Sequence, residues 1–588
     1  MRSIVSIVLI APALLFAVSI TPLTVLPAET PVRTGPPAGG PATGRPGQQS
    51  PCVIGHVDTI GGTTYDWAAN GPAVRMIANV PGTGIHALWM HSVDTVTGTT
   101  FPDRNMRYNF YDYATHAWNW IDPDFMQSGV NTYAERTGFG SLEADPNTGV
   151  AVISAHYATS SLAPKLARDI APGAGIFEYC AGDPTIDDNA WAWVKVNNNG
   201  YYQLTMIDKT SEDFLMWSRA TSWCNWDPEV SVPAPAPEPL FPDHNIAVSK
   251  VPGVNDVCIT WVNSPDGFGV KPGYYRISTD AGDNWGNSTE LPLPEAFSPG
   301  SESVPSFHIT SLYPMYDKQN RLHIAAAVEA VVLDTNLWWC AEIWHWCAEN
   351  SPNWSRIRSA IREPAANIGY NAMLACRPSL GQDTAGNLFV AWEEFDGQNY
   401  TPGPPDRLLA DIWYSYSTDN GVNWEPGVRI TDSGSTCTYR FPVMLDMITD
   451  TVMVLYVTDS APGFFLYAEG PASSNPIVVQ KWPNPVVGIQ GPREALPKRM
   501  ELAAAPNPFR ASARLSYAVP RRGQAELVIY DASGRSVRTL SRGRAEPGRY
   551  TAVWDGRNDA GGQAAAGVYL YRYSLDDRQL TGKLTLTR

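Results

Sequence analysis

Short apolar stretches recur along most of the chain, and each follows a polar turn. Five of the six steps between successive copies are 63 to 66 residues long, and the remaining step is 43 residues. A further apolar segment precedes most copies, for example at residues 202–207 and 307–312. Paired strands repeated at such a period predict a β-propeller. The copies begin at Gly84, Gly149, Asp213, Asp256, Arg321, Asn387 and Asp450.

The number of copies predicts about seven blades for a propeller over residues 51–483, and a count of six also fits the spacing. The 43-residue step is interpreted as a reduced third blade. A proline-rich run at residues 233–242 is expected to form an extended surface connection between blades, because the repeat resumes in phase after it. A domain boundary at this run is the alternative.

A second motif, Ser-x-Asp-x-Gly-x-Asn-Trp, occurs twice in phase with the longer repeat. Its Ser and Asp side chains can bind the backbone of a tight turn, its Gly supplies a positive φ, and its Trp can pack between sheets. The motif resembles the Asp-box, or BNR repeat, of the sialidase-like propellers. The resemblance implies an all-β fold in which these residues brace the outer hairpin of a blade. They are Ser278, Asp280, Gly282, Trp285, Ser417, Asp419, Gly421 and Trp424.

The resemblance also suggests where an active site would lie. Sialidases of this fold bind a substrate carboxylate with three arginines, use a Tyr–Glu pair as nucleophile and an Asp as acid/base, and carry an Arg-Ile-Pro motif. That motif is missing, since Arg276-Ile277 leads directly into an Asp-box. Arg377 and Arg440 lie where inner strands should begin, and Arg136 is a third candidate. Converging guanidinium groups would bind a carboxylate, whereas pairing of each arginine with a local acid or carbonyl is the alternative.

Glu393 and Glu394 are the candidate catalytic carboxylates. Neighbours in a strand point to opposite faces, so these two cannot be assumed to flank one glycosidic bond. The sequence contains no motif for a nucleophilic serine, a phosphate-binding loop or a metalloprotease, and no Cys/His cluster has zinc spacing. We therefore expect no cofactor and no metal, and the catalytic residues stay unknown.

Composition and charge narrow the class of protein. Apolar residues make up 44% of the chain, which excludes a disordered protein, and 50 Pro with 48 Gly leave little room for long helices. The net charge of −16 argues against nucleic acid as a partner. One segment is rich in tryptophan, and these rings are expected either to pack between blades or to form a glycan-binding rim. They are Trp338, Trp339, Trp344 and Trp346.

The cysteines and the N-terminus indicate export. Eight cysteines without metal-ligand spacing favour disulfides, and Cys340 with Cys347 could close a hairpin. A 17-residue apolar run inside residues 1–28 predicts a signal peptide, with an uncleaved anchor as the alternative. A Pro/Gly-rich linker over residues 29–50 follows. No later apolar stretch is long enough for a membrane span, so the mature chain is expected to carry none.

The last 89 residues read as a separate module. After a linker at residues 484–499, residues 500–588 carry a net charge of +6, against −22 for the rest of the chain. Short strands alternate with turns such as Asp531-Ala-Ser-Gly534. This pattern predicts a small Ig-like β-sandwich. The expected strands cover residues 513–518, 526–530, 550–554, 567–573 and 583–586.

Motifs in a fixed order make this module more specific. They run from Pro506-Asn-Pro-Phe509 through Trp554-Asp-Gly-Arg557 to Ala566-Gly-Val-Tyr569. The module resembles the type IX secretion C-terminal sorting domain, and equally the Ig-like domain of the flagellar hook capping protein. The first resemblance implies export across the outer membrane and surface attachment through the type IX machinery. A plain Ig-like spacer is the alternative.

Together these observations predict an exported bacterial protein, secreted or attached to the outer-membrane surface, with a propeller and an Ig-like tail. The first functional hypothesis is a propeller that binds a glycan or an extracellular protein without catalysis. The second is a divergent sialidase-like glycoside hydrolase acting on acidic sugars. The third is a structural cell-surface protein.

Overall fold

A computed structural model describes residues 54–587, and its two compact units divide between Asn484 and Pro485. The predicted signal peptide, the linker at 29–50, the proline-rich run at 233–242 and most of the linker at 484–499 lie outside the described residues. No helix among the residues described is long and apolar enough to cross a membrane. The gaps within the described range are 70, 97–99, 159–161, 182–188, 210–213, 233–242, 263–271, 293, 295–305, 333–334, 370–371, 404–405, 433–434, 487–498, 511, 522, 546–547 and 560–561.

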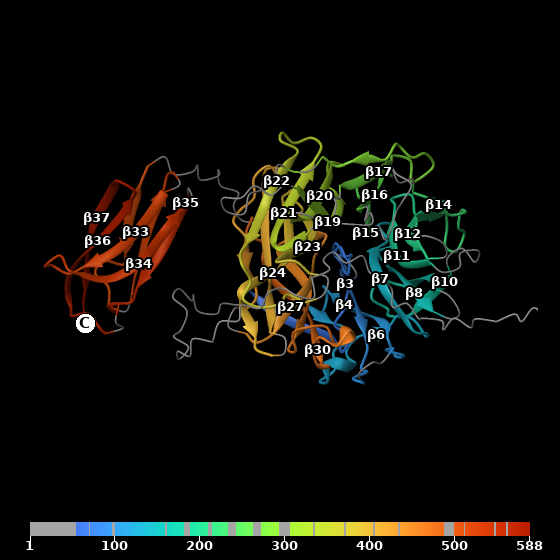
Figure 1. Cartoon of the computed structure of the whole chain (residues 1–588), viewed down its shortest axis with the longest axis horizontal. Helices are drawn as coiled ribbons and strands as arrows, with labels where there is room; N and C mark the ends of the chain where they lie inside the picture. The colour runs from blue at the N-terminus through green and yellow to red at the C-terminus, as the bar shows by residue number, and fades with distance from the viewer. Residues whose placement is uncertain are drawn as a thin grey trace, which may run out of the picture. The chain divides into compact units, whose positions relative to one another are not determined.

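The first unit is a ring of seven antiparallel sheets, which follow one another in chain order from blue through green and yellow to orange (Figure 1). We call them blades 1 to 7. The first strand of each blade is its inner strand. These are β2 (Ile77–Val80), β7 (Thr137–Ala144), β11 (Asn189–Val196), β15 (Asp243–Val248), β19 (Ser306–Tyr316), β23 (Ala375–Asp383) and β27 (Thr438–Met444).

The other strands of each blade pair outward from the inner strand. Blade 1 continues with β3 (Gly84–His91), β4 (Asn105–Asp112) and β5 (Ala117–Trp118), with β6 (Val130–Asn131) also paired to β4. Blade 2 continues with β8 (Ala151–Ala158), β9 (Leu162–Asp169) and β10 (Phe177–Ala181). Blade 3 continues with β12 (Tyr202–Asp208), β13 (Phe214–Ala220) and β14 (Val230–Ser231). Blade 4 continues with β16 (Val257–Val262), β17 (Gly273–Ser278) and β18 (Thr289–Glu290).

Blades 5 to 7 follow the same order. Blade 5 continues with β20 (Leu322–Val332), β21 (Thr335–Cys347) and β22 (Trp354–Ile361). Blade 6 continues with β24 (Leu388–Thr401), β25 (Arg407–Ser417) and β26 (Val428–Arg429), and β28 (Met447–Ile448) pairs with β23. Blade 7 continues with β29 (Thr451–Asp459) and β30 (Asn475–Pro483).

The ring is closed by a strand from the other end of the propeller. β1 (His56–Thr63) pairs antiparallel with β30, in a register that runs from His56 opposite Lys481 to Thr63 opposite Asn475. The outermost strand of blade 7 therefore comes from the start of the domain, and backbone hydrogen bonds tie the two ends of the ring together.

The predicted all-β architecture, a propeller followed by an Ig-like sandwich, is confirmed, and the described residues form seven blades rather than six. The prediction that the third blade is reduced was wrong. Six repeat copies coincide with second strands, but the copy counted from residue 213 leads into β13, the third strand of its blade. The true second strand is β12, so blade 3 has four strands like its neighbours.

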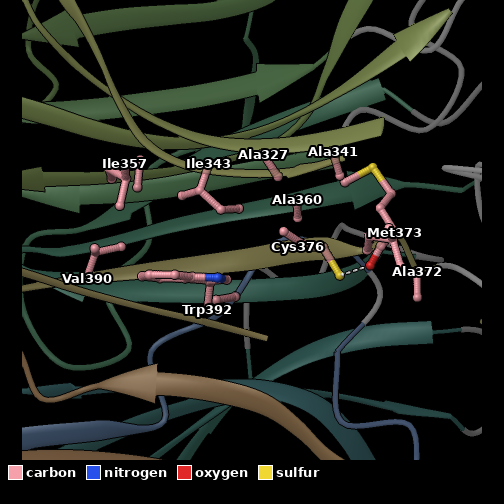
Figure 2. Packing of buried hydrophobic residues seen from close by; sticks show 14 of the residues in the cluster. Ala327, Ala341, Ile343, Ile357, Ala360, Ala372, Met373, Cys376, Val390 and Trp392 are labelled. Carbon is pink, nitrogen blue, oxygen red and sulfur yellow. Dashed lines mark hydrogen bonds between the residues drawn. The ribbon is translucent and has the colours of Figure 1, made fainter. Parts of the chain in front are cut away.

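Apolar side chains between neighbouring blades form much of the core. Ile343 and Ile357 of blade 5 lie in one buried cluster with Cys376 and Trp392 of blade 6 (Figure 2). Because both faces of these sheets are buried, the strands are nearly continuous apolar runs. Trp338, Trp344 and Trp346 are buried in the same region, so they pack within and between blades. Their burial excludes them from a glycan-binding rim, and Trp339 is partly buried against them.

The two Ser-x-Asp-x-Gly-x-Asn-Trp segments form matching turns between the third and fourth strands of blades 4 and 6. In blade 4, Ser278 Oγ donates to Asp280 Oδ1 at 2.8 Å and accepts the Gly282 amide at 2.8 Å. The Asn284 amide donates to Asp280 Oδ1 at 2.8 Å. The Trp285 ring packs edge-on against Trp217 of the preceding blade, with centroids 5.1 Å apart. These contacts brace the outer hairpin against its neighbour.

The blade 6 turn repeats this arrangement. Ser417 Oγ donates to Asp419 Oδ1 at 2.8 Å, and Trp424 Nε1 donates to Ser355 Oγ of the preceding blade at 3.2 Å. Gly421 has φ of +76°, and a Cβ there would lie 2.1 Å from the ring of His345. Both its backbone conformation and the close approach of the neighbouring blade require glycine at this position.

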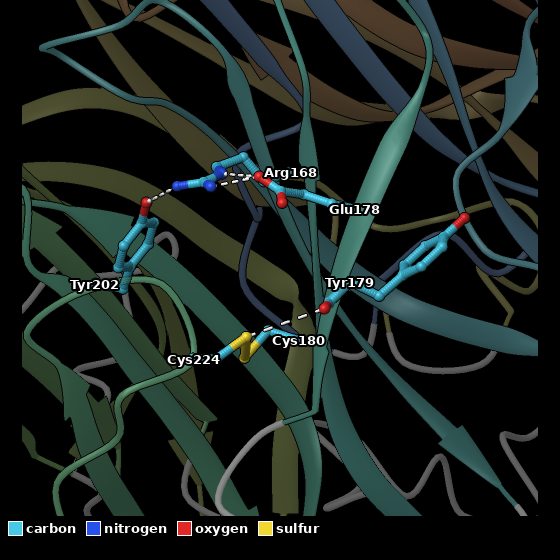
Figure 3. The surroundings of a disulfide bond; sticks show 6 residues. All are labelled: Arg168, Glu178, Tyr179, Cys180, Tyr202 and Cys224. Carbon is cyan, nitrogen blue, oxygen red and sulfur yellow. Dashed lines mark hydrogen bonds and ion pairs between the residues drawn. A yellow bond between two sulfur atoms is a disulfide. The ribbon is translucent and has the colours of Figure 1, made fainter.

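One disulfide links neighbouring blades. Cys180 of β10 is bonded to Cys224, which follows β13, and thereby ties blade 2 to blade 3 (Figure 3). Beside it, Arg168 Nε donates to Glu178 Oε1 at 2.7 Å, and Arg168 Nη1 donates to the Tyr202 hydroxyl at 3.0 Å. The predicted Cys340–Cys347 pair was wrong, because both are free cysteines on the single strand β21. Seven residues of extended chain separate them by roughly 23 Å.

The second unit is a two-sheet sandwich. One sheet contains β31 (Glu501–Ala505), β32 (Ala513–Val519) and β35 (Gly548–Trp554). The other contains β34 (Ser536–Ala545), β33 (Gly523–Tyr530), β36 (Gly567–Leu575) and β37 (Arg578–Leu586). Trp554 is fully buried at the centre, and its Nε1 donates to the Arg557 carbonyl at 2.8 Å. The five predicted strands are present, and β31 and β34 were missed.

Candidate functional site

The structure brings three of the predicted site residues together where the inner strands of blades 6 and 7 begin. Arg377 Nη1 donates to Glu393 Oε1 at 2.5 Å, and Arg440 Nε donates to the same oxygen at 3.2 Å. The Phe441 amide donates to Glu393 Oε2 at 2.8 Å. Glu393 lies on β24, so a single carboxylate of blade 6 binds one arginine of its own blade and one arginine of blade 7.

Local backbone geometry places these groups. Inner strands β23 and β27 each contain a bulge, at which Arg377 and Phe441 adopt φ of 53° and 58°. Phe139 in β7 and Trp191 in β11 occupy matching bulges with φ of 50°. Such values are rare for residues other than glycine. A bulge frees a backbone amide from its own sheet, and the preceding blade supplies the acceptor: Glu393 for Phe441, and His156 Nδ1 for Trp191 at 3.2 Å.

The electrostatics of this group favour a closed internal cluster. Burial alone would raise the pKa of Glu393, but Arg377 and Arg440 outweigh it and hold the pKa below its ordinary value. Both arginines are buried, and both guanidinium groups lie over the ring of Phe441 at 4.8 and 5.3 Å. Because they share a protein carboxylate, they do not present an open site for a substrate carboxylate.

The other two candidates lie apart from this cluster. Arg136 donates from Nε to the Phe101 carbonyl at 2.9 Å and from Nη2 to the Thr100 carbonyl at 2.7 Å. Glu394 points to the opposite face of β24 from Glu393, as the strand alternation predicted. There it accepts from Arg358 Nη2 at 2.6 Å and Arg362 Nη2 at 2.5 Å, both from blade 5. Glu394 therefore ties blade 6 to blade 5, and the predicted three-arginine site does not form.

The end of the channel at which the inner strands begin is occupied by the chain itself. We call this end the mouth. Residues 64–69 and 71–76, between β1 and β2, reach from one side of the ring to the other. The ring of Trp67, which is fully buried, lies 4.6 Å from Phe464 and 4.8 Å from Tyr467 of blade 7. Further along, Asn245 Nδ2 of blade 4 donates to the Ala73 carbonyl at 3.0 Å. We call residues 64–69 and 71–74 the plug.

Two buried carboxyl groups accompany the plug. Asp66 Oδ2 accepts the Phe465 amide, which anchors the plug to blade 7. Burial, and then the nearby Asp459 carboxylate, raise the pKa of Asp66 to about 7. Burial raises the pKa of Asp459 to about 6. These are carboxyl groups that can hold a proton near neutral pH, and sequence reasoning did not single them out.

A charged cluster lies on the channel axis near the opposite ends of the inner strands. Lys250 Nζ donates to Glu143 Oε1 at 2.5 Å, and Lys195 Nζ lies 3.1 Å from Glu143 Oε2. Arg75 Nη1 donates to Asp446 Oδ2 at 2.6 Å and lies 3.8 Å from Glu143 Oε1. We call these five residues the axial cluster. They border a cavity of about 30 Å³, which is lined by strands of blades 2 to 6 together with Arg75 before β2 and Asp446 after β27.

The charges in the axial cluster depend on one another. Burial opposes ionisation of Glu143, but Lys250, Lys195 and Arg75 outweigh it and hold the pKa of this carboxyl far below its ordinary value. Burial, which Glu143 only partly offsets, lowers the pKa of Lys195 to about 8. The cluster was missed from the sequence. Its only signal is a single charge inside an apolar strand, as in Leu142-Glu143-Ala144 and Val194-Lys195-Val196.

No group of His, Cys, Asp and Glu side chains suited to a metal ion occurs among the residues that the structure covers. A second cavity of about 30 Å³ lies between the plug and blades 1, 6 and 7, and its lining is mostly apolar. Each cavity has room for about two water molecules, so neither holds a sugar ring.

A known family model matches part of the second unit. Residues 511–577 match the family model described as the FlgD Ig-like domain. None of the curated proteins compared matches the chain.

Several solved structures resemble the first unit at low similarity. An ulvan lyase bound to -[GlcA(1-4)Rha3S]- is 12% identical, with 72% of this chain and 96% of that chain covered and a TM-score of 0.43. The polysaccharide lyase Uly1 is 11% identical, with 70% and 90% covered and a TM-score of 0.40. An α-L-arabinanase from Penicillium chrysogenum, solved with arabinobiose, is 10% identical, with 72% and 97% covered and a TM-score of 0.32. At these values the likeness establishes neither a shared substrate nor a shared activity.

Proposed function

We propose that this protein is an exported bacterial surface or secreted protein whose propeller binds a glycan or an extracellular protein without transforming it. The observation that carries the proposal is that the mouth of the channel is closed to a substrate. The plug fills it, and the two arginines that a sialidase-like enzyme would offer to a substrate share the buried carboxylate of Glu393. The glycan or protein would then bind to the loops, the blade edges or the opposite end of the channel.

A glycoside-acting enzyme is the second candidate, and one observation favours it. Asp66 has a pKa raised to about 7, which is the property required of a general acid at neutral pH. Asp459 supplies a second carboxyl group nearby, with a pKa raised to about 6. For this pair to act on a substrate, the plug would have to leave the mouth.

Binding and hydrolysis can be separated with the intact protein. We expect saturable binding to a subset of a glycan array, or to an extracellular protein, and no release of chromophore from chromogenic sialosides. An Asp66→Asn variant should bind like the unchanged protein. Hydrolysis that is lost in Asp66→Asn would establish the enzyme and contradict the binding proposal. Absence of both signals would favour a structural cell-surface protein.

We further propose that the Ig-like unit directs the protein to the surface by the type IX machinery. The support is the order of its motifs, from Pro506-Asn-Pro-Phe509 to Ala566-Gly-Val-Tyr569, on a compact sandwich separate from the propeller. The match of residues 511–577 to an Ig-like family is compatible with this role and with a spacer.

Deletion of residues 500–588 should leave a folded propeller that accumulates in the periplasm, because the propeller has its own core and closes its own ring. The measurement is cell fractionation combined with surface labelling in the native host. A variant with Lys318 replaced by methionine, on the propeller surface, serves as the control and should reach the surface normally. Surface display of the truncated protein would contradict the sorting role.

A further inference from the structure

The axial cluster contains more positive than negative charge. Arg75, Lys195 and Lys250 face only two carboxylates, Glu143 and Asp446, which leaves one positive charge uncompensated within the cluster. Arg75 and Lys195 are nine-tenths buried or more. A buried charge without a partner is costly. This excess positive charge lies in a domain whose sequence carries a net charge of −22 outside the tail.

Unused hydrogen-bonding groups border the same cavity. Tyr316, at the end of β19, lines the cavity, but its hydroxyl lies toward Asp256, Cys258 and Tyr275 and away from the axial cluster. Arg75 also lines the cavity, and its Nε is buried without a hydrogen-bond partner among the described residues. Lys195 and Lys250 each have further N–H donors beyond the one directed at Glu143. The cavity therefore combines two ammonium groups with a guanidinium group, which is a donor set suited to an anion.

The cavity is small and reachable from solvent. Its volume of about 30 Å³ fits one carboxylate group or two waters, and excludes a sugar ring. The Lys250 side chain is 26% exposed and that of Asp446 is 14% exposed, so solvent reaches the cluster at this end of the channel.

We propose that the axial cavity binds one carboxylate group, held by the ammonium groups of Lys195 and Lys250 beside the guanidinium group of Arg75. A monovalent carboxylate neutralises the excess charge, and its two oxygens satisfy donors that the protein leaves unused. The carboxylate can belong to a small free acid or to a uronic acid that approaches from solvent. The site stands apart from the proposed function, because it does not require the propeller to bind a glycan.

The test uses the full-length protein and four probes in buffer kept at constant ionic strength. Sodium formate represents a free carboxylate and sodium D-glucuronate represents a uronic acid, while formamide and glucose are their neutral counterparts. Isothermal titration calorimetry should show one saturable site for formate, for glucuronate or for both. Formate alone identifies a small-acid site, and glucuronate binding identifies a site that admits a sugar acid.

Variants distinguish this site from general charge effects. Lys250→Met should weaken carboxylate binding at least tenfold, whereas Tyr316→Phe removes a hydroxyl that lies away from the cavity and should leave the binding unchanged. Lys318→Met is the matched control, since Lys318 is an exposed lysine two positions past β19, and it should bind like the unchanged protein. No saturable binding to either carboxylate, equal binding of sodium chloride, or equal weakening by Lys318→Met would overturn the proposal.

Discussion

Replacing Glu393 with glutamine is expected to lower the free energy of unfolding by about 3–5 kcal/mol. The carboxylate is the shared counter-ion of Arg377 and Arg440, which are both buried. The amide that replaces it keeps the size and one acceptor oxygen, but it cannot neutralise two guanidinium groups. The cost is therefore that of two uncompensated buried cations rather than of one lost hydrogen bond.

Urea unfolding at pH 7, followed by tryptophan fluorescence, measures this change. Glu425→Gln is the control, because Glu425 is exposed and its replacement should change stability by less than about 0.5 kcal/mol. Combining Glu393→Gln with Arg377→Met should recover part of the loss, since it removes one of the stranded charges. If Glu393→Gln instead kept full stability and abolished ligand binding, the two arginines would serve a ligand, and the internal cluster would be refuted.

Most of the fold was predicted from two patterns: the repeat of apolar stretches and the alternation of side chains along each strand. A period near 64 residues was sufficient to predict the propeller, and alternation correctly separated Glu393 from Glu394. The error at the third blade had a physical cause. Residues 202–207 and the stretch after residue 213 are adjacent strands of similar apolar character, so periodicity alone could not tell the second strand from the third.

The site was less predictable because ring closure assembles it from residues far apart in sequence. Asp66 and Phe465 are 399 positions apart, and Arg75 and Asp446 are 371 apart. Neither pair belongs to a local motif, and each forms only because β1 joins blade 7. Arg377 and Arg440 were found because each lies where an inner strand was expected to begin. The identity of their partner required knowledge of which blades are neighbours.

Replacing Trp67 with alanine is expected to lower the free energy of unfolding by about 3–5 kcal/mol, the usual cost of removing a large buried ring. The indole is fully buried against Phe464 and Tyr467, and it anchors the plug beside the Asp66–Phe465 hydrogen bond. Urea unfolding measures the change. Ile121→Ala, at a side chain that is 52% exposed, should leave stability nearly unchanged.

Loosening a plug should expose only the mouth of the channel, whereas loosening an ordinary part of the core should expose the whole propeller. In Trp67→Ala, hydrogen exchange should accelerate first at amides of the mouth, such as those of Trp191 and Phe441, while amides at the axial cluster keep their protection. Trp67→Phe, which retains an aromatic ring, should lose less stability and show less acceleration. Uniform acceleration throughout the propeller would mean that Trp67 supports the ring as a whole. Selective acceleration would instead show that the mouth can open while the ring stays closed, which is the condition that any activity involving Asp66 would have to meet.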